Sequence, residues 1–316
     1  MNMDLTKAKV PTRRAFAERL VEYGEIDKDF VVFESDIGYS TYTHLFGDKY
    51  PARYFNMGIQ ELNTMDAAAG MAAEGRTALV AGYGVFLSMR AIEAVRSFVC
   101  YPNLNVKIIS SHGGITPAID GVTHQASEDM AFLSTLPNMK VLVPADTLAA
   151  KNCVDLVMKT SGPCFVRLMR DPLYDIYGPE DSFHMAGSHC LREGGDITIA
   201  AYGDIVFQAL EAAETLSERG IEAEVLDLYS FKPLDYASVR KSIEKTGHLL
   251  VAEDHQKRNG MGYDLASYCL REYPVPFDHI GLEDTFAESG DYQSLIEKYG
   301  LSAAHITEKA EQIIKK

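Results

Sequence analysis

Short apolar runs alternate with amphipathic stretches in both halves of the chain, and this alternation limits the fold more than any other feature. In the first half, the apolar runs that predict strands lie at 30–33, 77–81, 105–114, 139–146 and 163–171. The stretches with a helical pattern lie at 12–23, 61–75, 88–100 and 148–159. Strands separated by helices pair in parallel. We therefore predict an α/β protein of two domains, each a mostly parallel sheet flanked by helices.

An irregular stretch separates the two alternations. Residues 171–194 contain prolines, glycines and tyrosines without an apolar period. We interpret them as a linker, which places the first domain at 1–180 and the second at 181–316. A chain of 316 residues has the usual length for two domains.

The charge and the cysteine content restrict the partners and the compartment. The formal net charge of −15 argues against nucleic acid or an anionic membrane as a partner. Five cysteines without a CxxC spacing are typical of a reduced, intracellular protein. The longest charge-free stretch, 77–89, is too short to span a bilayer, and the N-terminus lacks the apolar segment of a signal peptide. We expect a soluble, cytoplasmic protein.

Glu61 begins a predicted helix of small and apolar residues within the stretch 54–75. One face of this helix is apolar enough to be buried. A carboxylate in the first turn interacts favourably with the helix dipole, so its position alone favours an ordinary exposed glutamate. The alternative is a glutamate directed into the interior, which would be a functional residue. Both interpretations are open at this point.

Several predicted strands of the first domain are followed by polar and aromatic side chains. The carboxyl ends of parallel strands meet at one edge of a sheet, where ligands bind. Each residue taken alone has a structural explanation, such as a turn, a core contact or a surface ion pair, but their convergence predicts a site. Histidines, carboxylates and an arginine beside aromatic rings suit acid–base chemistry on an anionic substrate. These candidates are Asp36, Ser40, Tyr83, Phe86, His112, Asp120, His124 and Arg170.

The common motifs of other chemistries are absent from the sequence. No Walker A loop, no GxGxxG after a strand and no GxSxG elbow is present, which argues against nucleotide hydrolysis, nicotinamide redox chemistry and esterase activity. His112 and His124 have no third ligand at zinc spacing. We predict no metal site formed by this chain.

Three segments of the sequence carry motifs of a known enzyme family. MGIQE at 57–61, with its small-residue helix, resembles the pyrimidine-binding domain of thiamine-diphosphate enzymes. The stretch 119–146 is similar to the transketolase segment with the DGxTHQ signature, and EVLDLYSFKPLD at 224–235 is similar to the start of the transketolase C-terminal domain. The likeness covers nearly the whole chain. It implies transfer of a two-carbon ketol unit from a ketose phosphate to an aldose phosphate.

The resemblance also implies that a second chain supplies the diphosphate-binding domain. Thiamine-diphosphate enzymes hold the diphosphate and Mg²⁺ with a GDG motif, whereas no Gly-Asp pair of this sequence precedes a glycine. The chain therefore resembles the C-terminal subunit of a split transketolase. An N-terminal subunit would carry the diphosphate-binding domain and the Mg²⁺, in an α₂β₂ heterotetramer. The second domain would serve mainly in assembly.

By this resemblance, four residues contact the cofactor. Glu61 matches the glutamate that bonds a ring nitrogen of the aminopyrimidine and so promotes formation of the reactive carbanion. Phe86 and Tyr83 match the stacked aromatic residues, although a further family tyrosine is replaced near Met89 or Arg90. Asp36 matches an aspartate close to the cofactor.

The resemblance likewise assigns the substrate contacts. Asp120 and His124 match residues that bond the sugar hydroxyls near the reacting carbonyl, and His124 is, with Glu61, a predicted catalytic residue. Charge-assisted bonds are the strong ones for phosphate. The predicted phosphate-binding residues are Arg13, Ser40, His112 and Arg170. Arg13 is preferred to Arg14 by register alone.

Two interpretations besides a transketolase subunit are open: another enzyme with the same two-domain plan, and a subunit without catalytic activity. The β subunit of a 2-oxo-acid dehydrogenase shares this plan but needs no phosphate cluster, and the related deoxyxylulose-phosphate synthases are normally single chains. The third interpretation is a non-catalytic scaffold subunit. No motif that we identify specifies which sugar phosphates are used. The motifs also do not distinguish general from specialised metabolism.

Overall fold

The sheet of the first domain has seven strands in the order β12-β6-β7-β5-β4-β2-β3. The structure is a computed structural model that describes residues 6–315. All neighbouring strands are parallel except β12, which runs antiparallel to β6. The strands are β2 (Phe30–Glu34), β3 (Tyr54–Asn56), β4 (Thr77–Tyr83), β5 (Val106–Ser111), β6 (Lys140–Leu142), β7 (Cys164–Arg167) and β12 (Ser230–Lys232).

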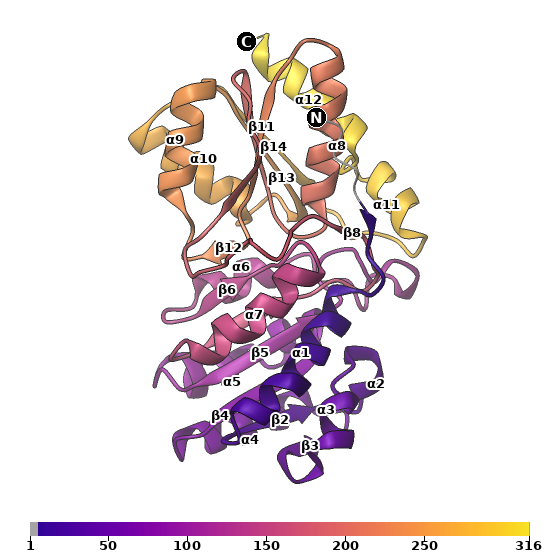
Figure 1. Cartoon of the computed structure of the whole chain (residues 1–316), viewed down its shortest axis with the longest axis vertical. Coiled ribbons are helices and arrows are strands. Elements are labelled where there is room, and N and C mark those ends of the chain that lie inside the picture. Colours follow the sequence, from indigo (N-terminus) through magenta and orange to yellow (C-terminus); the bar gives the residue numbers. More distant parts are fainter. Residues whose placement is uncertain (1–5, 316) are drawn as a thin grey trace.

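Helices cover both faces of this sheet (Figure 1). Phe30 and Val32 of β2 share a buried cluster with residues of α1 (Thr12–Ile26) and α7 (Thr147–Lys159). Val31 and Phe33 point to the other face and join the cluster formed with α4 (Glu61–Ala73). A strand that is buried on both faces must be apolar throughout, which explains the continuous FVVF run. The connections hold α2 (Gly38–Thr41), α3 (His44–Lys49), η1 (Pro51–Arg53), η4 (Ala118–Asp120) and α6 (Asp129–Thr135).

The second domain repeats the plan with five strands in the order β14-β13-β10-β11-β9. Four of them are parallel, and β9 forms an antiparallel edge. The strands are β9 (His189–Arg192), β10 (Ile197–Ala201), β11 (Ala223–Asp227), β13 (Leu249–Gln256) and β14 (Phe277–Leu282). The helices are α8 (Ile205–Glu218), α9 (Tyr236–Thr246), α10 (Met261–Glu272), α11 (Tyr292–Lys298) and α12 (Ala303–Ile314). Two mostly parallel sheets flanked by helices confirm the predicted fold class.

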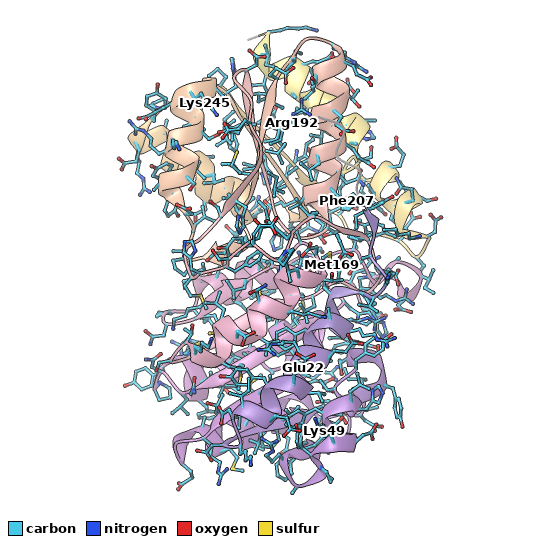
Figure 2. All side chains as sticks on the ribbon, in the orientation of Figure 1. Glu22, Lys49, Met169, Arg192, Phe207 and Lys245 are labelled. Atoms are coloured by element: carbon cyan, nitrogen blue, oxygen red, sulfur yellow. The ribbon has the colours of Figure 1, made fainter. Side chains whose placement is uncertain are left out.

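The domains are stacked along the long axis of the molecule and share a buried ion-pair group (Figure 1). Arg167 of β7 donates from Nη1 to Asp254 of β13 over 2.6 Å and from Nε to Asp129 over 3.1 Å. Gly114 makes room for this group, because a Cβ at its position would lie 1.5 Å from Asp254 Oδ2 and its φ is +56°. In Figure 2, Met169 also lies at this junction.

The stretch predicted as a structureless linker, 171–194, contains two short strands. In it, β8 (Tyr174–Asp175) pairs antiparallel with β1 (Thr6–Lys7), and β9 forms the edge of the second sheet. The ring of Tyr174 lies 4.5 Å from that of Phe207 in α8, which is labelled in Figure 2. These strands are too short to show an apolar pattern in the sequence. The boundary at 180/181 stays a prediction.

The helix predicted at 88–100 is interrupted. A π-helical turn, η2 (Phe86–Arg90), is followed by α5 (Ile92–Ala94) and a second π-helical turn, η3 (Val95–Cys100). Such turns occur often at functional sites. In the described part of the chain, no helix combines the length and apolar character that a bilayer span requires.

Candidate active site

Four neighbouring strands, β7, β5, β4 and β2, bring the predicted site residues to one edge of the first sheet. Asp36 follows β2, Tyr83 ends β4, His112 follows β5, and Arg170 lies beyond the end of β7. Because the strands are parallel and adjacent, these positions are close in space. The loops between strands and helices supply the other members.

Tyr83 is at the centre of the cluster. Its ring centroid is 4.1 Å from that of His112 and 5.7 Å from that of His124, and its hydroxyl donates to Ser40 Oγ over 2.8 Å. Phe86 lies 6.1 Å from Tyr83 and meets His124 edge-on at 5.7 Å. The two histidines, the two aromatic rings and the serine therefore form one continuous group.

Two arginines extend this group. Arg13 donates from Nη1 to Ser40 Oγ over 3.1 Å and from Nε to the carbonyl oxygen of Arg170 over 2.9 Å. The Arg170 side chain lies 3.5 Å from the carboxylate of Asp120. Burial lowers the pKa of Arg13 from its ordinary value. Arg14 instead forms an ion pair within its own helix, so only Arg13 of the two is directed into the cluster.

His112 is a neutral histidine. Its side chain is buried, and burial together with the charges of Arg13 and Arg170 and with His124 lowers the pKa of His112 to about 2. Its Nδ1 lies 2.7 Å from Ser111 Oγ. An uncharged imidazole between two arginines can act as a hydrogen-bond partner for an anion without adding charge.

We expect His112→Asn to reduce the acid sensitivity of the fold. The pKa of His112 is lower in the folded chain than in the unfolded chain, so the unfolded chain gains the extra proton and stability falls as the pH drops below about 6.5. Between about pH 8 and about pH 5, His112 accounts for a loss of about 2 kcal/mol, which the variant lacks. Urea unfolding at both pH values measures this, with His305→Asn as the control. An unchanged pH dependence would contradict it.

Glu61 is buried, with 3% of its surface exposed, at the first position of α4. The interpretation as an ordinary exposed glutamate is therefore wrong. Its Oε2 accepts a hydrogen bond from Arg90 Nη1 at 3.4 Å, and the Arg90 guanidinium carbon lies 5.6 Å from the centre of the Phe86 ring. Through Arg90, Glu61 is connected to the aromatic part of the cluster.

Asp36 is connected to the segment before Glu61. Its Oδ1 accepts from Asn56 Nδ2 over 2.9 Å, and Asn56 Oδ1 accepts from the backbone N–H of Gly58 over 2.9 Å. Asp36 is exposed and has a φ of 61°, a strained value for a residue other than glycine. The structure thus brings Asp36 towards the Glu61 turn rather than towards the arginines.

Comparison with protein families identifies both halves of the chain. The family model "Transketolase, pyrimidine binding domain" matches residues 8–174, and "Transketolase, C-terminal domain" matches residues 188–306. The chain belongs to the transketolase family. This confirms the resemblance stated from the sequence.

Known transketolase chains of similar length resemble this one from end to end. A putative transketolase C-terminal section of Methanocaldococcus jannaschii is 35% identical, over 96% of both chains. A 6-deoxy-6-sulfo-D-fructose transketolase subunit of Clostridium sp. is 35% identical over 95% of this chain and 94% of its own. A subunit of the apulose-4-phosphate transketolase of Phocaeicola vulgatus is 33% identical over 97% of this chain and 98% of its own.

Solved transketolase structures agree with this. A split-gene transketolase in an inactive β₄ tetramer superposes with a TM-score of 0.91 at 38% identity, over 97% of this chain and 99% of its own. The transketolase of Campylobacter jejuni has a TM-score of 0.82 at 21% identity, over 97% of this chain but 47% of its own. That second likeness shows the fold alone.

Sequence reasoning missed two features of this transketolase chain. It gave Arg90 no role, although its spacing of four from Phe86 places both on one helical face. It assigned none to Asp254 either, which pairs with Arg167 between the domains. No local pattern indicates that second pair, because its members are 87 residues apart.

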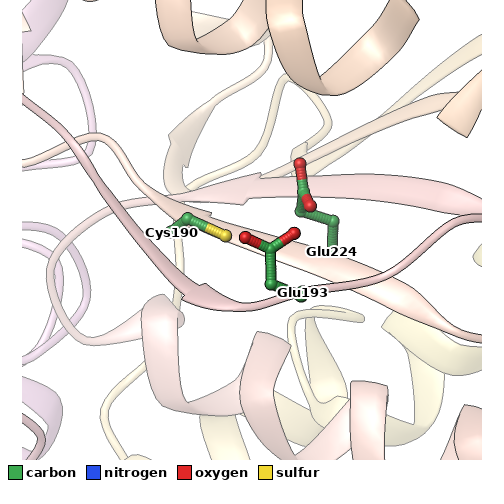
Figure 3. A group of neighbouring side chains, drawn as sticks. All are labelled: Cys190, Glu193 and Glu224. Carbon is green, nitrogen blue, oxygen red and sulfur yellow. The ribbon is translucent and has the colours of Figure 1, made fainter. Parts of the chain in front are cut away.

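Three neighbouring side chains of the second domain are of the types that can bind a metal ion. Ligand atoms of Cys190, Glu193 and Glu224 lie within 4.8 Å of one another (Figure 3). The ammonium group of Lys245 lies 2.6 Å from Glu193 and also contacts Glu224. A lysine therefore supplies the positive charge between the two glutamates, and we assign no metal to this group.

Proposed function

We propose that the chain is the C-terminal subunit of a thiamine-diphosphate-dependent transketolase. In this proposal, it transfers a two-carbon ketol unit between sugar phosphates, together with an N-terminal subunit in an α₂β₂ complex. The observation that carries the proposal is the cluster of Arg13, Ser40, His112 and Arg170 beside Tyr83. The names of the relatives, which are sections or subunits of transketolases, support the division into two chains.

The residues around Glu61 fit the pyrimidine half of the cofactor. Glu61 is a buried carboxylate that, among the described residues, accepts a side-chain hydrogen bond from Arg90 at 3.4 Å, so its carboxylate oxygens have capacity for a further bond to a ring nitrogen. Phe86 is a half-buried aromatic ring that Arg90 connects to Glu61, and the half-buried ring of Tyr83 lies 6.1 Å from that of Phe86. Asp36 is connected to the segment before Glu61 through Asn56. Thiamine diphosphate supplies a carbon nucleophile and an electron sink. We propose that the N-terminal subunit holds its diphosphate and the Mg²⁺.

The substrate would lie between the aromatic rings and the arginines. Asp120 and His124 are placed to bond hydroxyl groups, because His124 lies beside Phe86 and Asp120 beside Arg170. Arg13 and Arg170 then provide positive charge for the phosphate, Ser40 a hydroxyl and His112 a neutral imidazole. In this arrangement His124 would move a proton at the reacting carbonyl, while the arginines fix the far end of the sugar.

Arg170→Ala is expected to raise KM for ketose phosphates about tenfold while kcat changes less, since one charge-assisted contact to phosphate is worth about 1.4 kcal/mol. Steady-state kinetics of the assembled complex measure both constants. Arg14→Ala is the matched control, because Arg14 lies outside the cluster. An unchanged KM would favour a 2-oxo-acid dehydrogenase subunit instead.

The direct test is an assay of the chain alone and with its N-terminal partner, thiamine diphosphate and Mg²⁺. We expect ketol transfer only from the complete mixture. Strong activity of the chain alone would contradict the two-subunit proposal. The relatives act on sugars as different as a sulfofructose and apulose 4-phosphate, by their names, so the assay should include several anionic ketoses.

A further inference from the structure

Arg90 contacts two of the residues that we assign to the cofactor ring, Glu61 and Phe86. Its Nη1 lies 3.4 Å from Glu61 Oε2, and its guanidinium carbon lies 5.6 Å from the centre of the Phe86 ring. The side chain of Arg90 is 59% exposed, whereas that of Glu61 is 4% exposed. A mostly exposed side chain is therefore paired with a buried carboxylate.

A guanidinium can make the two kinds of interaction that an aminopyrimidine makes. It is planar, it donates N–H groups to a carboxylate, and it packs against the face of an aromatic ring. Here one guanidinium makes both contacts, with Glu61 and with Phe86. We propose that Arg90 is a placeholder for the cofactor ring: it pairs with Glu61 and covers Phe86 in the free subunit, and it leaves both when the ring binds.

The local backbone and the burial of Glu61 both support this role. Phe86 and Arg90 are the first and last residues of the π-helical turn η2, so they lie on one face of it. A buried carboxylate without a partner is costly, and Arg90 provides the ion pair shown for Glu61 among the described residues. Because Arg90 is mostly exposed, its charge returns to water when it leaves.

The placeholder must weaken cofactor binding slightly. In this proposal, the cofactor binds only to subunits in which Arg90 has left Glu61. The apparent Kd then equals the intrinsic Kd divided by the fraction of subunits in that state. Ion pairs with an exposed member are weak, so the effect is about threefold. This inference rests on the proposed function, since it needs thiamine diphosphate as the ligand of Glu61.

Two measurements test it. The first is calorimetric titration of thiamine diphosphate with Mg²⁺ into the assembled complex, in which we expect Arg90→Ala to bind about threefold more tightly than the wild type. Arg96→Ala, which removes an exposed arginine further along the same helical segment, is the matched control and should leave Kd unchanged.

The second measurement is urea unfolding of the free subunit, without cofactor, for Arg90→Ala, Glu61→Gln and the double variant. We expect the two substitutions to be non-additive, as for residues in contact.

The outcomes separate this inference from the proposed function. An unchanged or weaker Kd for Arg90→Ala, when the wild type binds the cofactor, overturns the placeholder and leaves the transketolase proposal intact. Additive effects on unfolding overturn the pairing of Arg90 with Glu61. A wild-type complex that binds no thiamine diphosphate overturns the proposed function and, with it, the competition.

Discussion

Glu61→Gln is expected to lower the turnover of the assembled enzyme by about 100-fold or more, the usual size of a lost proton-transfer partner. Glutamine keeps the shape of the side chain, which is buried at the start of α4. It removes the negative charge and the proton-accepting oxygen that a ring nitrogen of the cofactor would need. The measurement is kcat for a ketose phosphate and an aldose phosphate with saturating thiamine diphosphate and Mg²⁺.

The control for this prediction must separate chemistry from assembly. Glu74→Gln makes the same chemical change at the exposed C-terminal end of the same helix and should leave kcat unchanged. Gel filtration of the complex should show the same assembly for both variants and the wild type. Full turnover of Glu61→Gln in an intact complex would identify the chain as a scaffold subunit.

Much of the fold follows from local pattern because its sheets are covered on both faces. All five residues of β2 are buried, so a parallel strand of this kind appears in the sequence as an unbroken apolar run. The helix predicted at 148–159 has nearly those bounds in the structure, where α7 covers Thr147–Lys159. Its apolar period was a sufficient signal.

The parts that escaped prediction depend on contacts between distant segments. Strand β12 leaves the second domain and pairs with β6 of the first sheet, through Ser230 with Leu142 and Lys232 with Val141. Nothing in a three-residue strand specifies a partner so far along the chain. The π-helical turn at Phe86–Arg90 was also missed, because it differs from an α-helix by hydrogen-bond spacing and not by composition.

The predicted sheet topology was sufficient to show that the residues of the candidate site lie close together. It was not sufficient to predict which of them are buried. Strand ends predicted that Tyr83 and His112 would be neighbours, and their rings are 4.1 Å apart. The burial of Glu61 contradicted the interpretation from helix position, since burial depends on what packs over the first turn of α4. The roles of these residues stay predictions until the variants are measured.

Arg167→Met is expected to cost about 3–5 kcal/mol of unfolding free energy, because it leaves buried carboxylates without their counter-ion. Asp129 and Asp254 have fully buried side chains, and Arg167 is 3% exposed. Burial alone would lower the pKa of Arg167, but the two carboxylates raise it well above its ordinary value. The arginine is therefore charged in the folded chain, and its loss unbalances the junction between the domains.

The expected pH dependence gives this prediction a second test. Burial raises the pKa of Asp129 in the folded chain, and the charge of Arg167 opposes this rise. Without Arg167, the folded variant therefore binds more protons at Asp129 than the unfolded chain does and loses stability as the pH rises. The deficit relative to the wild type should then be larger at about pH 8 than at about pH 5. Urea unfolding of the free subunit at both pH values measures the deficit.

Arg19→Met is the matched control for the buried pair. Arg19 of α1 also makes two hydrogen bonds to one aspartate, Asp155 of α7, at 2.9 and 2.8 Å. Its side chain is 24% exposed and that of Asp155 is 28% exposed, and ion pairs accessible to water are worth about 0–1 kcal/mol. If Arg167→Met cost no more than Arg19→Met, the group at the domain junction would not hold the two sheets together, and apolar packing across the junction would have to do so instead.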